Sequence, residues 1–140
     1  MGQQQLLLLV LSTVIVGLAT VAGIQAFDEG QSQAANDALT QRAVSVASDI
    51  QAQAKKPAQL GGIDPTSDGN TTIANAIGIE KPDSVDASGA GQNANCKITR
   101  SNSATQVKCQ SDNTETNVTA EVSTSDGSGD ISTSFSTGTI

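Results

Sequence analysis

The chain of 140 residues contains no histidine, tryptophan or tyrosine, and phenylalanine occurs only at Phe27 and Phe135. Without histidine, neither a Ser-His-Asp nor a Cys-His catalytic set can form within the chain. Since there are only two cysteines, zinc sites built from His and Cys are nearly excluded as well. Asp112, Asp126 and Asp130 do not match the spacing of an EF-hand loop and are interpreted as solvated carboxylates in loops. We therefore predict a protein that is not an enzyme and has no cofactor and no metal.

Positive charge is also scarce, because seven basic residues face fourteen acidic ones and the formal net charge is -7. The basic residues are scattered, apart from the pair Lys55-Lys56. Nucleic-acid binding needs a clustered positive surface, so no nucleic-acid partner is expected. An acidic exterior rich in Ser and Thr instead keeps the polar part of the chain soluble.

One long apolar run is present, from Leu6 to Ile24, with 19 residues and no charge or proline. No charged side chain occurs before Asp28. This length approaches the roughly 20 residues that a helix needs to cross the hydrocarbon of a bilayer. Residues 3–27 are therefore predicted to form the hydrophobic half of a helix that spans a membrane or forms the core of an assembly.

Small residues inside the run gather on two helix faces. One face carries Thr13, Gly17 and Thr20, and the other carries Ser12, Ala19, Gly23 and Ala26. Small residues let helix backbones approach closely in an apolar medium. We expect Thr13, Gly17, Thr20 and Gly23 to pack against several like helices. The alternative is an ordinary membrane anchor with small residues at these positions by chance.

The helical pattern continues through residues 28–56. Leu39, Ala43, Val46 and Ile50 form one apolar stripe at helical spacing. Lys55-Lys56 complements the helix dipole and Pro57 ends the helix. One helix from Gln3 to Lys56 would be about 80 Å long. Such a length does not fit a compact globule of this size, so half of the helix must be buried by something else.

Residues 57–95 form a connection punctuated by Gly and Pro, with one short helical turn predicted at Ile73 and Ile77. Beyond it, strands begin. Pairing residues 96–100 with 105–109 about Asn102-Ser103 places Cys96 opposite Cys109 and Ile98 opposite Val107 on one face. This register predicts a hairpin with a cross-strand Cys96–Cys109 disulfide. Two free buried thiols in a reducing compartment are the alternative.

A second hairpin folds Thr116–Thr124 onto Gly129–Thr137 about the turn Asp126-Gly127. Its register pairs Val122 with Ile131, Ala120 with Thr133 and Val118 with Phe135, so that the large apolar residues share one face. The predicted fold is α+β. In it, the amphipathic half of a long N-terminal helix packs against a four-stranded antiparallel sheet head formed by residues 96–140. The outer face of the sheet is expected to face solvent.

Two sequence patterns concern modification. Asn70-Thr71-Thr72 and Asn117-Val118-Thr119 match the acceptor pattern for N-glycosylation, which makes Asn70 and Asn117 candidate sites. In a chain rich in Asn, Ser and Thr, such matches also arise by chance.

This layout resembles the type IV pilins: a helix that is half apolar and half amphipathic, a Gly/Pro-rich connection, and a sheet with a C-terminal disulfide. Gly2 lies where prepilin peptidase cleaves such chains, which implies a short leader of residues 1–2 and a mature chain that begins at Gln3. The chain departs from the family in three respects. Gln3 and Leu7 stand where type IV pilins usually have Phe and Glu, and the leader has no basic residue. Without a carboxylate before Asp28, the pairing attributed to that Glu is absent here.

The resemblance implies a structural subunit of a type IV pilus-like filament that assembles through its hydrophobic helix. Its partners would be copies of itself, the inner (cytoplasmic) membrane before assembly, and the assembly machinery. Its final location would be an extracellular filament on the cell surface. A single-pass membrane-anchored surface protein, or a pseudopilin of a secretion system, is the alternative.

Overall fold

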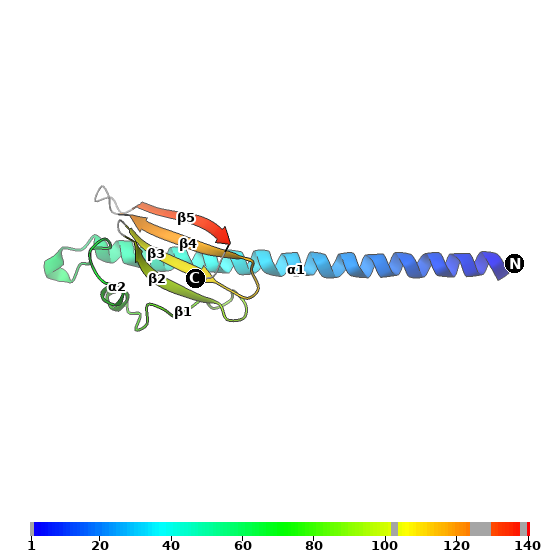
Figure 1. The fold of residues 1–140 in the computed structure, drawn as a ribbon, viewed down its shortest axis with the longest axis horizontal. Coiled ribbons are helices and arrows are strands. Elements are labelled where there is room, and N and C mark those ends of the chain that lie inside the picture. Colours follow the sequence, from blue (N-terminus) through cyan, green and yellow to red (C-terminus); the bar gives the residue numbers. More distant parts are fainter. Residues whose placement is uncertain (1, 102–103, 124–129, 138–139) are drawn as a thin grey trace. The chain divides into compact units, whose positions relative to one another are not determined.

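The computed structural model describes residues 2–101, 104–123, 130–137 and 140. The elements in chain order are α1 (Gly2–Ala54), a 3-10 turn η1 (Ala58–Leu60), α2 (Asn70–Ala76), β1 (Val85–Asp86), β2 (Asn95–Ser101), β3 (Ala104–Gln110), β4 (Thr116–Ser123) and β5 (Asp130–Thr137). They are labelled in Figure 1. The chain divides into two compact units. The first ends at Gln33 and is called the helical unit; the second, Ala34–Ile140, is called the sheet unit.

Helix α1 is continuous over 53 residues, as predicted, but it ends at Ala54 instead of Lys56. The Lys55 N–H still donates to the Gln51 carbonyl at 3.1 Å, whereas the Lys56 N–H turns to Gln53 at 3.2 Å. Proline disfavours a helical backbone at the residue before it, so Pro57 acts on Lys56 as well as on itself. The last turn therefore tightens before the proline is reached.

The sheet is antiparallel with strands in the order β1-β2-β3-β4-β5. It has five strands, so the prediction of four was wrong. The additional strand is β1, which pairs Val85 with Cys96 and Asp86 with Asn95. It lies within residues 57–95, which were expected to be only a connection. The short helix predicted around Ile73 is present as α2.

Both predicted hairpin registers are confirmed. Cys96 pairs with Cys109 and Ile98 with Val107 in the β2–β3 ladder. The β4–β5 ladder pairs Val122 with Ile131, Ala120 with Thr133 and Val118 with Phe135. The predicted turn residues Asn102-Ser103 and Asp126-Gly127 lie outside the described residues. Local alternation of apolar and polar side chains thus determined the pairing correctly.

The core lies between the inner face of the sheet and the predicted stripe of α1. Leu39, Ala43, Val46 and Ile50 are all buried there. They belong to one cluster with Ile98, Val107, Val118 and Val122 of the sheet and with Ile73 of α2. Figure 1 shows this part of α1 running along one face of the strands. The amphipathic half of the helix therefore buries its apolar stripe within its own chain.

The outer face of the sheet is more enclosed than expected. Asn117 and Thr119 on β4 are buried there, at 7% and 8% exposure. The Ile140 N–H donates to the Gln110 side-chain oxygen at 3.3 Å, which places the end of the chain over this face. The prediction of a fully solvent-facing outer surface was therefore wrong for β4. The outer side chains of β5 are exposed as predicted.

Polar contacts hold the loops to the sheet. The Arg100 guanidinium donates to the Ser67 carbonyl at 2.6 Å, and the Thr105 hydroxyl donates to the Pro65 carbonyl at 2.7 Å. Gly91 has a φ of 97°, and a Cβ at this position would lie 2.6 Å from Cγ of Asn113. This close approach lets the Gln92 N–H donate to Oδ1 of Asn113 at 3.2 Å. Glycine is thus required at position 91 both by backbone conformation and by space.

Asp64 begins the loop that Arg100 and Thr105 hold. Its carboxylate accepts hydrogen bonds from the Thr66 hydroxyl at 2.6 Å and from the Thr66 N–H at 2.9 Å. These bonds, the hydroxyl first, lower the pKa of Asp64 from 3.8 to about 2. Hydrogen bonds to the charged form favour ionisation, so this loop is best held when Asp64 carries its charge.

Candidate functional site

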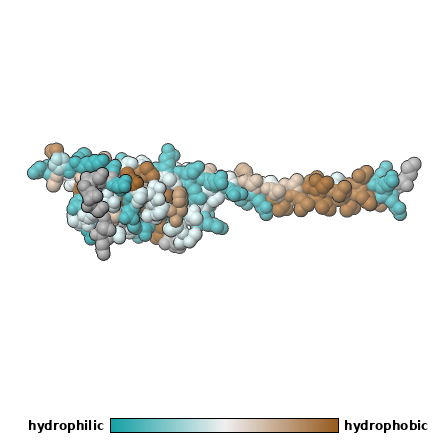
Figure 2. Space-filling model, turned by 90° about the horizontal axis from the view of Figure 1, so that it is seen from above, coloured by the Kyte–Doolittle hydropathy of each residue, from teal (hydrophilic) through white to brown (hydrophobic). Residues whose placement is uncertain are grey.

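The helical unit presents a long apolar surface to its surroundings. The large apolar side chains from Leu6 to Phe27 are all 52–69% exposed. Figure 2 shows hydrophobic residues following one another along this stretch. Soluble proteins rarely expose so large a contiguous apolar surface, and one of this size marks an interaction site. We call residues Leu6–Ile24 the apolar helix segment and treat it as the candidate functional site.

The polar side chains of this segment are all satisfied within the helix itself. The Ser12 and Thr13 hydroxyls donate to the Leu9 and Val10 carbonyls at 2.9 and 2.8 Å. The Thr20 hydroxyl donates to the Val16 carbonyl at 2.8 Å. Ser12, Thr13 and Thr20 are the only polar side chains between Leu6 and Ile24. No hydroxyl in the segment therefore needs water, and the surface suits an apolar environment.

The glycines of α1 have no structural role within the chain. A Cβ at Gly17, Gly23 or Gly30 would meet nothing within 4 Å. Glycine in a helix interior costs about 0.5–1 kcal/mol relative to alanine, so each of these positions weakens the helix. No described contact offsets this cost. The space that Gly17 and Gly23 leave open on the helix surface is thus available to an apolar neighbour.

Bulky residues occupy a further line on the same segment. Leu7, Leu11, Val14, Leu18 and Val21 follow one another at alternating spacings of four and three residues. This is the 3.5-residue repeat with which helices interlock side by side. By helical geometry, the predicted packing residues Thr13, Gly17 and Thr20 lie about a third of a turn away from this line. The segment therefore offers both projecting and recessed faces.

The remaining predicted site residues lie as follows. Gly2 is the first residue of α1, Gln3 is exposed beside it, and Met1 lies outside the described residues. Asn70 is half-buried at the start of α2, and its side-chain oxygen is buried without a hydrogen-bond partner. Asn117 is 7% exposed in the interior of β4. An enzyme that adds glycans needs access to the amide, which the folded strand restricts at Asn117.

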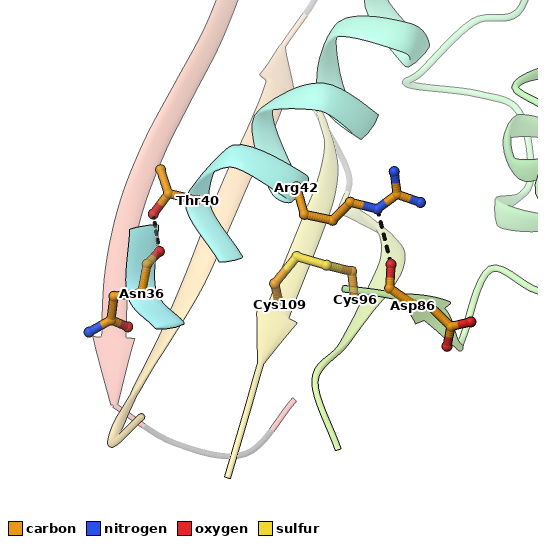
Figure 3. The surroundings of a disulfide bond; sticks show 6 residues. All are labelled: Asn36, Thr40, Arg42, Asp86, Cys96 and Cys109. Carbon is orange, nitrogen blue, oxygen red and sulfur yellow. Dashed lines mark hydrogen bonds between the residues drawn. A yellow bond between two sulfur atoms is a disulfide. The ribbon is translucent and has the colours of Figure 1, made fainter. Parts of the chain in front are cut away.

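The predicted disulfide is present between Cys96 of β2 and Cys109 of β3, with a Cα–Cα distance of 4.0 Å. Both residues are fully buried. Figure 3 shows the bridge below the turn of α1 that carries Arg42. Nε of Arg42 donates to the Asp86 carbonyl at 3.1 Å. The bridge and this hydrogen bond tie β3 to β2 and α1 to β1, so they hold the thin core together.

A second exposed apolar feature, which the sequence did not reveal, lies on β5. Phe135 pairs with the buried Val118 and therefore belongs to the inner face, yet it is 61% exposed. Strand β5 forms one edge of the sheet. Figure 1 draws it at the margin beside β4, where it is not covered by the ribbon of α1. Alternation had predicted the face of Phe135 correctly, but it carries no information on how far the helix covers that face.

No family model, curated protein or solved structure matches this chain. The resemblance to type IV pilins therefore rests on the order and character of the elements. The fold itself is α+β with a pilin-like layout, in which a long N-terminal helix packs on an antiparallel sheet of five strands. Helix α1 also meets the length and composition needed to cross a membrane, a test that signal sequences near an N-terminus meet as well.

Proposed function

We propose that this chain is a structural subunit of a type IV pilus-like filament and assembles through the apolar helix segment. The observation that carries the proposal is the pair of helix glycines, Gly17 and Gly23, at which an added Cβ would meet no other described part of the chain within 4 Å. They lie on a surface that is apolar and free of unsatisfied hydroxyls. Such a surface fits the side of a neighbouring helix.

The apolar helix segment must leave water. Burying a Val, Leu or Ile side chain contributes about 1.5–3 kcal/mol relative to leaving it exposed. A membrane can supply this burial before assembly, and like helices can supply it afterwards. Lipid tails adapt to any helix surface, so a lone anchor gains nothing from glycine. The alternation of recessed and projecting faces favours several neighbouring copies as the final environment.

The sheet unit has a different part in this proposal. Its inner face is filled by α1 except along β5, and the bridge Cys96–Cys109 stabilises the unit without a large core. With twelve acidic and seven basic residues between Ala34 and Ile140, it is soluble and acidic. It would cover the outside of the filament. Cleavage after Gly2 and insertion in the cytoplasmic membrane before assembly are the steps that the resemblance implies.

Electron microscopy of sheared cell-surface material tests the proposal directly. We expect thin fibres that contain this chain. A Gly17→Leu variant should enter the membrane normally and form no fibres, since leucine fills the space that a neighbouring helix needs. Ile15→Leu, which changes shape without adding volume, is the matched control and should assemble.

The alternative functions predict other outcomes. A single-pass surface protein would tolerate Gly17→Leu, would be extracted only by detergent, and would never appear in fibres. A pseudopilin of a secretion system would depend on Gly17 but would appear at low stoichiometry, without long surface fibres. Wild-type chain that stays monomeric in detergent and yields no fibres under any condition of expression would refute the filament proposal.

A further inference from the structure

A second interaction surface lies on the sheet unit, at the edge formed by β5. Seven of the eight residues of β5 are exposed, and Ile131 is partly buried. Proteins usually protect an edge strand with lysine, proline or a bulge, or by keeping it very short. The opposite edge, β1, has only two residues, which is one such protection. Strand β5 has eight residues, no lysine and no proline, so none of these three protections applies to its outer edge.

The sequence of β5 is self-complementary. Its two apolar residues, Ile131 and Phe135, lie on the inner face at equal distances from Thr133. When two β5 strands pair antiparallel with Thr133 opposite Thr133, Ile131 of each copy faces Phe135 of the other. Registers shifted by two residues place Phe135 opposite threonine or beyond the strand. Among antiparallel registers, only the one about Thr133 gives both apolar residues of each copy an apolar partner, which extends the apolar inner face across both copies.

Charge favours the same arrangement. Asp130 is the only charged residue of β5. Antiparallel pairing about Thr133 places Asp130 opposite Ser136 of the other copy, and Ser132 opposite Ser134. A parallel pairing in register would bring the two Asp130 carboxylates together, and like charges directly opposite one another are destabilising. The antiparallel pairing about Thr133 therefore avoids the repulsion that a parallel pairing in register would cause.

We propose that β5 is a docking edge for the β5 strand of a second copy of this chain, paired antiparallel about Thr133. The two-fold axis that relates the two copies is perpendicular to the sheet. It therefore reverses every direction parallel to the sheet, including the direction of α1 from Ala34 to Ala54. Copies whose helices run parallel in one filament cannot pair in this way. If the chain forms filaments as proposed above, the pairing joins two filaments that lie side by side and run in opposite directions.

A single β5 pair forms a small contact. Eight residues per copy fall below the roughly 20–30 residues per side of a standard stable interface. An isolated pair of chains is therefore expected to associate weakly. Aligned filaments repeat the contact many times, and linked weak contacts reach high avidity. Association should also rise with salt, because the chain carries a net charge of -7 and copies repel one another at low ionic strength.

Cysteine crosslinking of the full chain in detergent micelles tests the pairing without requiring filaments. Both native cysteines are in a disulfide, so an introduced thiol is the only free one. Under mild oxidation, Thr133→Cys should form a covalent dimer with several-fold higher yield than Thr137→Cys. The control residue lies on the same strand and is also exposed, but it has no counterpart within β5 in this register.

A mixture of two variants tests the register. Ser132→Cys and Ser134→Cys should crosslink to each other and much less to themselves. Equal dimer yields at Thr133 and Thr137, or no dimer at Thr133, would overturn the proposal. A mixture that crosslinks no better than its separate components would overturn the stated register.

Filaments supply a separate measurement. Phe135→Ser should leave single filaments intact while side-by-side bundles, seen by electron microscopy, become several-fold rarer. Thr137→Ser on the same strand is the matched control and should bundle normally. Undiminished bundling by Phe135→Ser would overturn the role of β5. If wild-type chain forms no filaments at all, the proposed function fails, and the crosslinking result still decides whether the β5 edge pairs.

Discussion

Reducing the Cys96–Cys109 disulfide should weaken the sheet unit strongly. The bridge joins β2 to β3 across a sequence separation of 13 residues. Both sulfur atoms are in the core, where few large side chains are available to compensate. A cross-link stabilises a protein mainly by restricting its unfolded chain, and the effect grows with the size of the closed loop.

The loop closed by this bridge contains about 14 residues, for which the chain-entropy relation gives about 3 kcal/mol at 25 °C. Domains of this size are stable by about 5–15 kcal/mol in total, so the loss is a large fraction. With a urea dependence of about 1–2 kcal/mol per molar, the unfolding midpoint should fall by about 1.5–3 M on reduction.

The measurement is a urea titration of the full chain in detergent micelles, followed by far-ultraviolet circular dichroism, with and without reductant. Tryptophan fluorescence cannot be used, since the chain has no tryptophan. Hydrogen exchange of the β3 amides adds a local measure, and protection there should fall with the midpoint. A Cys96→Ala/Cys109→Ala variant is the control, because reductant should leave its midpoint unchanged.

Two outcomes would contradict this reasoning. A midpoint that moves by less than about 0.3 M on reduction would mean that the bridge hardly restricts the unfolded chain. A reductant effect of similar size in the double-alanine variant would mean that the measured change has another origin. In either case the thin core, and not the cross-link, would account for the stability of the sheet unit.

Two further predictions concern the loops. Gly91→Ala should destabilise the sheet unit by about 1–3 kcal/mol, because it strains a left-handed backbone and drives a methyl group against Asn113; Gly69→Ala, where a Cβ meets nothing, should change the urea midpoint far less. The depressed pKa of Asp64 implies stability that is fully present above about pH 4 and is lost as the pH falls through about 2. Asp64→Asn should flatten this dependence in urea titrations at pH 5, 3 and 2, and an unchanged slope would show that the hydrogen bonds from Thr66 do not matter.

The hairpins could be predicted from sequence because their information is local. Cys96 with Cys109 and Val122 with Ile131 are joined by short connections, and alternation leaves only one register that gathers the apolar residues. The stripe of α1 was predictable for the same reason, since its helical spacing is clear from Leu39 to Ile50. In both cases the residues nearby in the sequence are enough to predict which side chains point into the core.

The errors arose where distant parts of the chain meet. Strand β1 has two residues, too few for any alternation, and exists because Val85 reaches Cys96. The burial of Asn117 and the exposure of Phe135 depend on what covers each face, which no strand sequence contains. The apolar helix segment could be located from the sequence. The hydrogen bonds of its hydroxyls to helix carbonyls, and the empty space beside its glycines, required the structure of the folded chain.

The hydrogen bonds between hydroxyls and carbonyls in the apolar helix segment bear on how the segment could move from a lipid environment to a helical one. Ser12, Thr13 and Thr20 have their carbonyl partners within α1 itself, so these bonds need no group from the surroundings. Passage from one apolar environment to another therefore breaks no side-chain hydrogen bond of this segment and requires no rescue by water. In the proposed assembly, the choice between lipid and neighbouring copies would then depend on how well the helix surfaces pack together, and not on side-chain hydrogen bonds.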